Sequence, residues 1–416
     1  MKNTVLSAAI TAACLVSSFT YAQSNNDTSF NPKISVILDG VYYSDNKGGD
    51  GIEHIEEMSG ILGSHGHDEE EHGHGELKRG FNIREAELTM SGTVDPHLDA
   101  WITVAFSNGE TEIEEAYFET RSLPSGWKMK AGKFFSGIGY HNQQHLHSWA
   151  FSDQTLAHQT FFGDHGLVDS GLQVTYLPAT PFYTLVGVEV FQGEQDKFGA
   201  EVEHDELKEG AGPRLSTAFL KIAPEIGTGS ELQLGLSLAR TGQHQEDHSE
   251  TPDVELLEGD ILLWGLDVVY KKLPTGSFGE GSFTLQAEYF NVSKELTIEA
   301  ASDIDEVGEE VTGDQDAFYL QTVYGIAPRW SIGARYEMAG MVNELKEEST
   351  DKLGDSRRVS LAATWQPTEY SKFRLQLSRA NISEFDEDLG KARSESFNQI
   401  YLQYNVSLGA HGAHQF

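Results

Sequence analysis

The chain has 416 residues, with 65 Asp or Glu against 29 Lys or Arg, so its formal charge at pH 7 is −36. Such an acid excess repels phosphate backbones, which argues against nucleic-acid binding and favours cations as partners. The 38% of hydrophobic residues and 10% of aromatic residues are too many for a disordered chain.

The N-terminus is typical of an export signal. Lys2 supplies a positive charge, residues 5–16 are apolar, and residues 20–22 form a small-residue cleavage site. We therefore expect residues 1–22 to be a signal peptide and residues 23–416 to form the mature protein. The single cysteine, Cys14, lies inside the signal, and a lipoprotein signal is the minor alternative. The mature chain would then have no disulfide and no thiolate metal site.

Beyond the signal the dominant period is two, which indicates β-strands. In the last segment, the even positions 400–410 are apolar and the odd positions 399–407 are polar. Asp267 and Glu288 lie in the middle of other segments, where a water-filled interior accepts charge and a packed core does not. Sixteen such segments begin near Ile34, Ile83, Trp101, Glu115, Trp127, Gly171, Tyr183, Leu215, Glu231, Ile261, Phe283, Phe318, Trp330, Val359, Phe373 and Asn398.

The connections between these segments alternate between short turns and long acidic loops. Even strand number, short turns at one end and long loops at the other are the pattern of outer-membrane barrels, and about sixteen strands leave an aqueous channel. The sequence thus predicts an all-β fold, a transmembrane antiparallel barrel of about 16 strands in the outer membrane of a Gram-negative bacterium. Expected partners are outer-membrane lipid, lipopolysaccharide and divalent metal ions, and the chain could form a homotrimer.

Most of the negative charge falls in predicted external loops. Six of them, residues 45–79, 194–210, 241–260, 294–316, 343–356 and 384–395, together carry a net charge of −33. An acidic rim of this kind concentrates cations at a channel mouth. The predicted inward residues of the wall are nearly balanced in charge, and Lys128, Lys130 and Lys133 leave room for a weak anion site on one strand.

Histidines are concentrated in the first and third loops. Loop 1, residues 45–79, contains pairs of imidazoles two residues apart among Gly and carboxylates, which suits zinc better than Ca²⁺ or Mg²⁺. The candidate ligands are His65, His67, His72, His74, Glu70 and Glu71. A solvated low-complexity loop with incidental metal affinity is the simpler alternative.

Loop 3, residues 141–165, is expected to fold into the channel, with its aromatic residues against the wall. His141 and His145 are four residues apart, which would put both on one side of a helical turn, and His147 follows. These three histidines are candidate metal ligands at a constriction. Ordinary hydrogen-bonded lumen lining explains them equally well.

Several motifs carry a resemblance to a known family. They are residues 81–88 (Phe-Asn-Ile-Arg-Glu-Ala-Glu-Leu), 91–92 (Ser-Gly), 115–118 (Glu-Ala-Tyr-Phe) and 130–134 (Lys-Ala-Gly-Lys-Phe). This opening third resembles the phosphate-selective porin O and P family, which implies a sixteen-stranded outer-membrane channel. The ending 407–416 is similar to a subgroup of zinc-regulated outer-membrane proteins, some of them labelled TonB-dependent receptors. The acidic rim departs from the basic lumen of phosphate-selective members, and the chain leaves no residues for a transporter's plug.

We predict a passive channel for divalent cations, with zinc as the preferred ion, in which loop 1 collects the metal and loop 3 selects it. No resident cofactor is required, and no catalytic motif is found, so an enzyme is not expected. A general or anion-preferring porin with an incidental histidine loop is the first alternative. A surface protein that sequesters metal or adheres, with the barrel as its anchor, is the second.

Overall fold

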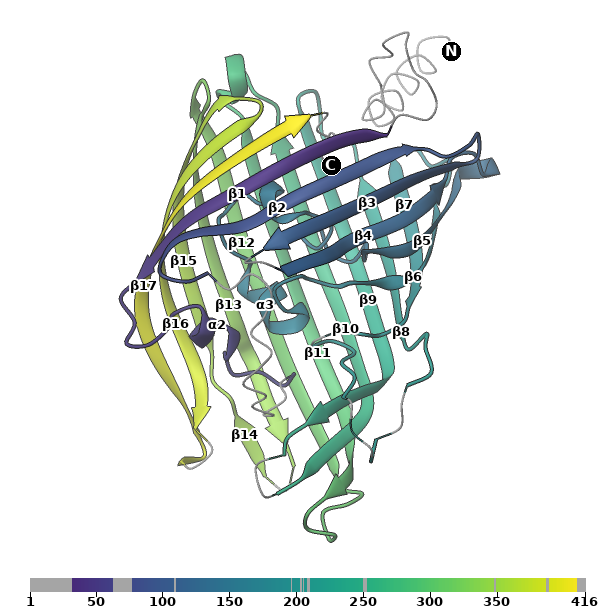
Figure 1. Ribbon diagram of the computed structural model, residues 1–416, viewed down its shortest axis with the longest axis vertical. Coiled ribbons are helices and arrows are strands. Elements are labelled where there is room, and N and C mark those ends of the chain that lie inside the picture. The colour runs from purple at the N-terminus through teal and green to yellow at the C-terminus, as the bar shows by residue number, and fades with distance from the viewer. Residues whose placement is uncertain are drawn as a thin grey trace.

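The computed structural model describes residues 32–62, 77–107, 110–195, 197–202, 204, 206–207, 210–249, 253–347, 349–386 and 389–409. Sixteen antiparallel strands form a closed barrel, in which neighbours in the chain pair and the last strand pairs with the first (Figure 1). They are β1 Lys33–Asp45, β2 Gly80–Thr93, β3 Leu98–Ser107, β4 Glu110–Thr120, β5 Trp127–Phe135, β6 Val168–Tyr176, β7 Tyr183–Phe191, β8 Leu215–Ala223, β9 Ser230–Asp247, β10 Glu255–Lys272, β11 Phe283–Ala301, β12 Glu310–Ala327, β13 Trp330–Lys346, β15 Ser356–Thr368, β16 Ser371–Asp386 and β17 Lys391–Gly409. A seventeenth strand, β14 Thr350–Lys352, only pairs with the end of β13. The predicted barrel is confirmed.

The helices are short. They are α2 Glu53–Glu56, α3 Leu156–Phe162 and the 3₁₀ turns η2 Pro124–Gly126, η3 Leu146–Ser148 and η4 Ser277–Gly279. Within the described part of the chain, no helix is long and apolar enough to cross a membrane. α2 and α3 belong to the first and third long loops and are drawn inside the outline of the barrel in Figure 1.

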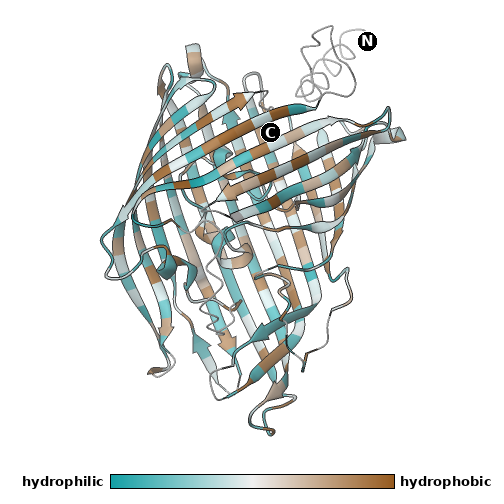
Figure 2. Cartoon of the chain, viewed as in Figure 1, coloured by the Kyte–Doolittle hydropathy of each residue, from teal (hydrophilic) through white to brown (hydrophobic). Residues whose placement is uncertain are grey.

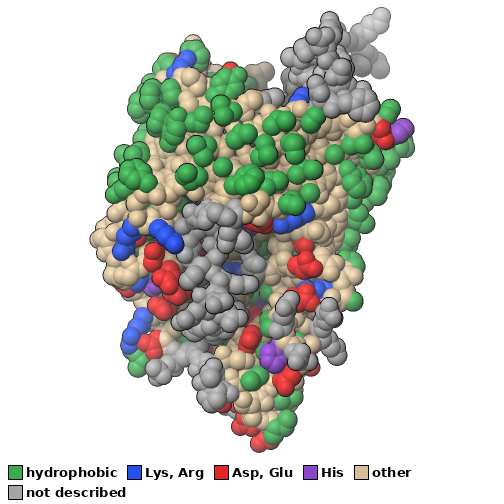
Figure 3. Space-filling model, in the orientation of Figure 1, with side chains coloured by type: hydrophobic (Ala, Val, Ile, Leu, Met, Phe, Trp, Pro, Cys, Tyr) green, Lys and Arg blue, Asp and Glu red, His purple; other side chains and the backbone are tan. Residues whose placement is uncertain are grey.

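The two ends of the barrel have opposite surfaces. We call the part nearest the short turns the turn half and the part nearest the long loops the loop half; on β10 they meet near Ile261. In the turn half, Leu262 and Leu266 point outward and are exposed, while Asp267 points inward. In the loop half, Asp260 points outward, and Leu257 is buried inside. Figure 3 shows hydrophobic side chains gathered over one half and charged side chains over the other, and Figure 2 shows the alternation along the strands.

This inversion corrects four predicted loops. The ranges 241–260, 294–316, 343–356 and 384–395 are largely strand. In them, β9 continues to Asp247, β11 to Ala301, β13 to Lys346 and β16 to Asp386, and β10 begins at Glu255, β12 at Glu310 and β17 at Lys391. A strand needs only about 9–11 residues to cross the bilayer, so strands of 18 and 19 residues extend beyond it. Beyond the bilayer the outer face of these strands is in water. Its acidic residues therefore look like loop residues in the sequence.

An apolar core fills the inside of the loop half and its boundary. Phe161 and Phe162 of α3 and Ile61 and Leu62 of loop 1 belong to one cluster of buried residues with inward residues of the wall. The wall residues include Leu257, Phe290, Leu296, Ile298 and Val311. Burial of such side chains stabilises by about 1.5–3 kcal/mol each. The loops therefore pack inside the barrel and narrow it.

Candidate functional site in the barrel lumen

Loop 3 enters the lumen between β5 and β6, as expected from the sequence. Its helix α3 packs against β11, β12 and β13, and all of its residues are buried. Thr155 caps the helix, since its side chain accepts a hydrogen bond from the backbone N–H of His158. The predicted helical turn through His141 and His145 is not formed. The chain instead makes the 3₁₀ turn at Leu146–Ser148 and begins its helix at Leu156.

Charged side chains of the wall hold the backbone of loop 3. Lys372 donates a hydrogen bond to the carbonyl of His147 at 2.7 Å, and Lys221 donates to that of Gly139 at 2.7 Å. The further cationic donors to loop carbonyls are Arg84, Arg335, Arg358 and Arg374, which bind Ser152, Asp153, Gln154 and Trp149 respectively. Backbone N–H groups of the loop donate to the wall carboxylates Glu189, Glu288 and Glu337. Predicted lumen charges are thus largely used to position loop 3.

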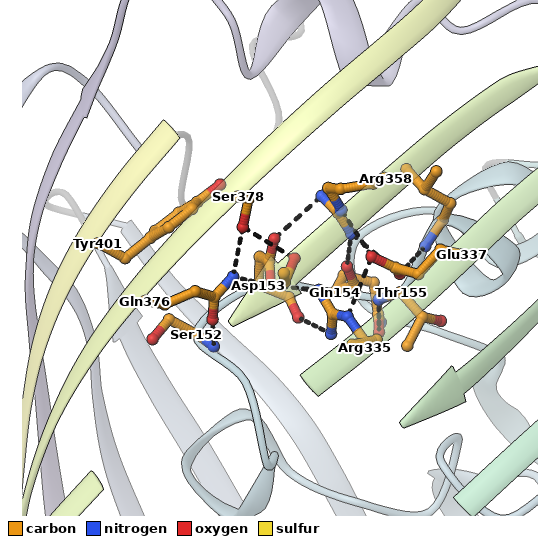
Figure 4. Close-up of polar contacts among 12 residues, drawn as sticks. Ser152, Asp153, Gln154, Thr155, Arg335, Glu337, Arg358, Gln376, Ser378 and Tyr401 are labelled. Carbon is orange, nitrogen blue, oxygen red and sulfur yellow. Dashed lines mark hydrogen bonds and ion pairs between the residues drawn. The ribbon is translucent and has the colours of Figure 1, made fainter. Parts of the chain in front are cut away.

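One part of this network is a buried set of four charges (Figure 4). Asp153 of loop 3 pairs with both Arg335 and Arg358, at 3.0 Å between Arg358 Nη1 and Asp153 Oδ2. Glu337 Oε2 in turn lies 3.0 Å from Arg335 Nε and 2.7 Å from Arg358 Nε. Two cations face two anions, so these arginines are already neutralised and offer little to a passing anion.

A second cluster combines imidazole with carboxylates. His145 Nε2 lies 2.9 Å from Glu115 Oε2, and His145 Nδ1 lies 3.4 Å from both Glu87 Oε2 and Glu114 Oε2. His147 Nδ1 makes a contact of 2.9 Å with the same Glu87 oxygen, and its ring stacks on that of His145 with centroids 5.7 Å apart. Loop 3 thereby delivers two predicted candidates to acids on β2 and β4.

A β-bulge explains how two consecutive glutamates reach the same histidine. Thr103 of β3 pairs with Glu115 of β4, but the next residue, Val104, pairs with Ile113, which leaves Glu114 as the extra residue. A bulge breaks the strict alternation and re-aims a side chain. Both Glu114 and Glu115 therefore contact His145 in the lumen, although neighbours on a regular strand would face opposite sides.

The histidines of loop 3 fall into two electrostatic classes. Burial opposes charge on His145, but the carboxylates of Glu114 and Glu115 outweigh burial and hold its pKa well above the ordinary value. Burial lowers the pKa of His141 well below its ordinary value, and the neighbouring His158 adds to the effect. Burial also lowers the pKa of His158 to about 3. By its lowered pKa, His141 belongs with His158 and not with His145. The rings of His141 and His158 also pack together, with centroids 4.7 Å apart.

A cavity of about 150 Å³ lies beside the cluster of His145. Its acidic and imidazole lining includes Glu85, Glu112, Glu114, His145 and His165, and loop 1 contributes Ile52, Ile55 and Glu56. The cationic residues Arg84 and Arg358 also line it, but each pairs with an acid of the interior, Asp39 and Glu337 respectively. Acidic side chains therefore outnumber basic ones in the lining of the cavity.

Loop 1 is described on both sides of its histidine-rich part. Ser59 donates its N–H to the Ser383 carbonyl at 2.9 Å, and the N–H of Ile61 binds Gln315 at 3.1 Å, which ties the loop to β16 and β12. The six loop 1 candidates lie outside the described residues: His65, His67, His72, His74, Glu70 and Glu71. The predicted signal peptide, residues 1–22, lies outside them as well.

The structure adds residues that sequence reasoning did not nominate as ligands. Glu87 and Glu115 were placed on the inward face by alternation, but their meeting with His145 depends on the path of loop 3. The only sequence signal for Glu114 was the break in alternation at Glu114 and Glu115.

The lysines considered for an anion site are engaged by other groups. Lys128 pairs with Glu119 at 2.7 Å and Lys133 with Glu112 at 3.0 Å. Lys130 lies over the ring of Tyr117, 4.5 Å from its centroid. These contacts leave little free positive charge on β5, and they weaken the case for the weak anion site.

Comparison with known proteins supports the fold. No family model matches the chain. An uncharacterized protein of Aquifex aeolicus (strain VF5) is 35% identical over 399 residues, which cover 93% of this chain and 80% of that protein.

Similar solved structures are outer-membrane proteins. The trimer form of OmpT of Vibrio cholerae has a TM-score of 0.53 at 13% identity, covering 91% of this chain and 99% of that one. The outer membrane channel DcaP of Acinetobacter baumannii has a TM-score of 0.52 at 15% identity, with 91% and 96% covered. An anion-selective porin from Comamonas acidovorans has a TM-score of 0.50 at 11% identity, with 91% and 99% covered. These likenesses confirm the fold, a barrel like those of outer-membrane porins and channels.

Proposed function

The chain belongs to the same family as the Aquifex aeolicus protein and is a porin-like barrel of the outer membrane, and we propose that it is a channel for the passive uptake of divalent cations. Zinc is the ion that its imidazole and carboxylate groups fit best. The observation that carries this proposal is the charge of the lumen: carboxylates and imidazoles face the cavity beside His145, whereas the wall arginines that line it are paired.

Most basic groups of the barrel wall are already bound to loop 3 or to an acid. Lys221, Lys372 and Arg374 donate to carbonyls of loop 3, and Arg335 and Arg358 are neutralised by Asp153 and Glu337. The cavity is lined by more acids than bases: Glu56, Glu85, Glu112, Glu114, Asp153 and Asp164 stand against Arg84 and Arg358, although Glu112 pairs with Lys133 and Asp153 with both Arg335 and Arg358. A narrow passage with this lining raises the local concentration of cations and repels anions.

The finer parts of the proposal concern loop 1 and zinc. The histidines of residues 65–74 would collect zinc at the mouth, where the acidic outer surface of the loop half concentrates it. Weak binding at several places is required, because a tight cage would stop conduction. This charge pattern agrees with the proposal that the chain is related to the zinc-regulated subgroup and not to phosphate-selective porins.

The assembly of the barrel is also a proposal. OmpT of Vibrio cholerae is described in a trimer form, and the barrel shares its fold. We propose that this chain likewise forms a homotrimer embedded in lipid and lipopolysaccharide. Each trimer would then contain three parallel channels. In a bilayer, one trimer would conduct in three current steps of equal size.

The test is ion selectivity in a planar lipid bilayer. Purified full-length protein should show a reversal potential of cation preference in a salt gradient, and micromolar zinc should reduce the single-channel current. As a matched variant, replacing His65, His67, His72 and His74 by Asn should reduce zinc uptake by cells in zinc-poor medium and leave the cation preference intact. Anion preference would instead identify an anion-preferring porin, and absence of conductance would identify a barrel that only anchors its loops.

A further inference from the structure

The distances within the cluster around His145 fit those of a zinc site. His145 Nδ1 lies 3.4 Å from Glu87 Oε2 and 3.4 Å from Glu114 Oε2, and the three ligand atoms all lie within 4.8 Å of one another. Zinc bonds nitrogen and oxygen at about 2.0–2.2 Å, so two ligands of a tetrahedral ion are about 3.3–3.6 Å apart. The observed separations from His145 therefore match edges of such a tetrahedron.

The second nitrogen of His145 is oriented as in metal sites. His145 Nε2 lies 2.9 Å from Glu115 Oε2, which fixes the ring and leaves Nδ1 directed at Glu87 and Glu114. A carboxylate on the far nitrogen of a ligating imidazole holds the tautomer that metal binding needs. The Glu87 carboxylate is held in the same way, by Thr89 on Oε1 at 2.8 Å and by His147 near Oε2 at 2.9 Å.

The ligand atoms themselves are left without hydrogen bonds. Glu87 Oε2, Glu114 Oε2 and His145 Nδ1 are buried, and their contacts with one another and with His147 Nδ1, at 2.9–3.4 Å, are ion pairs that do not have hydrogen-bond geometry. Glu87 is 3% exposed. Buried polar atoms are normally satisfied, so atoms converging on one point without hydrogen bonds indicate a missing partner. Three carboxylates against two imidazoles also leave excess negative charge, which a divalent cation would neutralise.

We propose that Glu87, Glu114 and His145 bind a zinc ion, or a similar borderline divalent cation, inside the lumen, with Glu115 and His147 as positioning residues. The mixed nitrogen and oxygen set favours such ions over Ca²⁺ and Mg²⁺, which prefer oxygen alone. The site opens on the cavity lined by Glu114 and His145, so the ion enters from the passage and has room for water as its fourth ligand. This site rests on the proposed function, as the point at which a permeating ion is selected.

Binding can be measured without any conductance. The full chain, carrying His65, His67, His72 and His74 replaced by Asn to silence loop 1, is stripped of metal in detergent and titrated with ⁶⁵Zn²⁺ by equilibrium dialysis. We expect a zinc site that weakens at least about 100-fold in His145→Asn and in Glu114→Gln. Glu115→Gln should weaken it by about 10–100-fold, the usual effect of losing an orienting partner.

A matched control and a variant-independent measurement keep the test decisive. Glu119→Gln removes an acid from the same strand that pairs with Lys128, and it should leave zinc affinity unchanged. X-ray absorption of the zinc-loaded, loop-silenced chain should show one imidazole and oxygen ligands at about 2.0–2.2 Å. Unchanged affinity in both His145→Asn and Glu114→Gln, or a zinc shell without imidazole, would overturn the site.

Failure of the site and failure of the proposed function give different results. A cation-selective channel whose zinc affinity does not depend on His145 keeps the function and loses the site. A chain that binds zinc at His145 but prefers anions in the bilayer keeps the site and loses the function.

Discussion

The turn half and the loop half of the barrel use the same strands with opposite polarity. On β11 of the turn half, Leu285 and Tyr289 face outward, and Gln286 and Glu288 face inward. Further along the same strand, Glu295 and Glu299 face outward while Leu296 and Ile298 are buried inside. The alternation of side chains continues along the whole strand. The outward side chains change from apolar to acidic, and the inward ones from polar to apolar, where the lipid outside is replaced by water.

This reversal teaches that a barrel strand has no fixed polar face. In the turn half the outside is lipid and the inside must accept charge. In the loop half the outside is water, and the inside is filled by loops 1 and 3, so it resembles the core of a soluble protein. The lumen is thus wide enough for two loops, and the acids and histidines that remain beside them define the passage.

Truncating the apolar core around α3 should have the largest effect. Phe290 of β11 is fully buried and packs on Phe162 and His158 of α3, with ring centroids 5.6 and 5.4 Å away. Phe290→Ala should cost about 3–5 kcal/mol, the usual range for a buried aromatic residue, and should loosen loop 3. Denaturant unfolding measures the first effect, and a larger, noisier single-channel current shows the second.

The control for Phe290 lies three residues along the same strand. Ser293 faces outward at the boundary of the two halves, where it pairs with Leu262, and Ser293→Ala should change stability by no more than about 0.5 kcal/mol. If Phe290→Ala were as mild as Ser293→Ala, the contact between α3 and the wall would not be a packed core.

Charging the outer surface should distinguish the halves directly. Leu266 is 50% exposed on the lipid-facing surface of the turn half, so Leu266→Arg should destabilise the barrel by about 2–4 kcal/mol in vesicles. Glu295→Arg, on the outer face of the loop half, should stay within about 0.5 kcal/mol because that face is in water. Unfolding followed by tryptophan fluorescence compares them, and equal losses would contradict the boundary near Ile261.

Much of the wall could be predicted from the sequence. Period two located all sixteen strands, because each one crosses the bilayer with an apolar outer row. Strand ends were missed at β9 to β12, since the outer residues Asp260 and Glu295 look like loop residues once the outside is water. Many acids assigned to an external rim of loops are therefore on paired strands.

The site was less predictable, because it depends on contacts between distant segments. His145 and His147 were candidates from their density alone, and the structure joins them to Glu87 and Glu114, more than 30 residues earlier in the chain. His141 was expected to act with them, but α3 begins after them, and His141 packs on His158 of that helix. A bulge at Glu114 and the path of loop 3 are three-dimensional features that spacing does not encode.

Lowering the pH should weaken the contact between α3 and the wall at the junction of the two halves. This is the smallest of the expected effects. His158 is completely buried against Phe290, its Nδ1 is 2.8 Å from Thr155 Oγ1, and the groups facing it are His141, Tyr319 and Glu288, the last at 3.9 Å. Burial lowers the pKa of His158 to about 3, below its ordinary value of about 6.5, so the neutral ring is the form compatible with docking.

The free energy that holds loop 3 against the wall is therefore fully present above about pH 6.5 and falls as the pH is lowered toward 3. The loss is about 1.4 kcal/mol per pH unit, which gives about 2 kcal/mol at pH 5. Single-channel current should become larger and noisier over this range in the wild type. His158→Gln keeps a polar side chain without a titrating ring and should reduce the pH dependence, while the lowered pKa of His141 leaves a remainder of the same sign. A profile identical in both proteins would mean that the interior opens at a place other than the contact between α3 and Phe290.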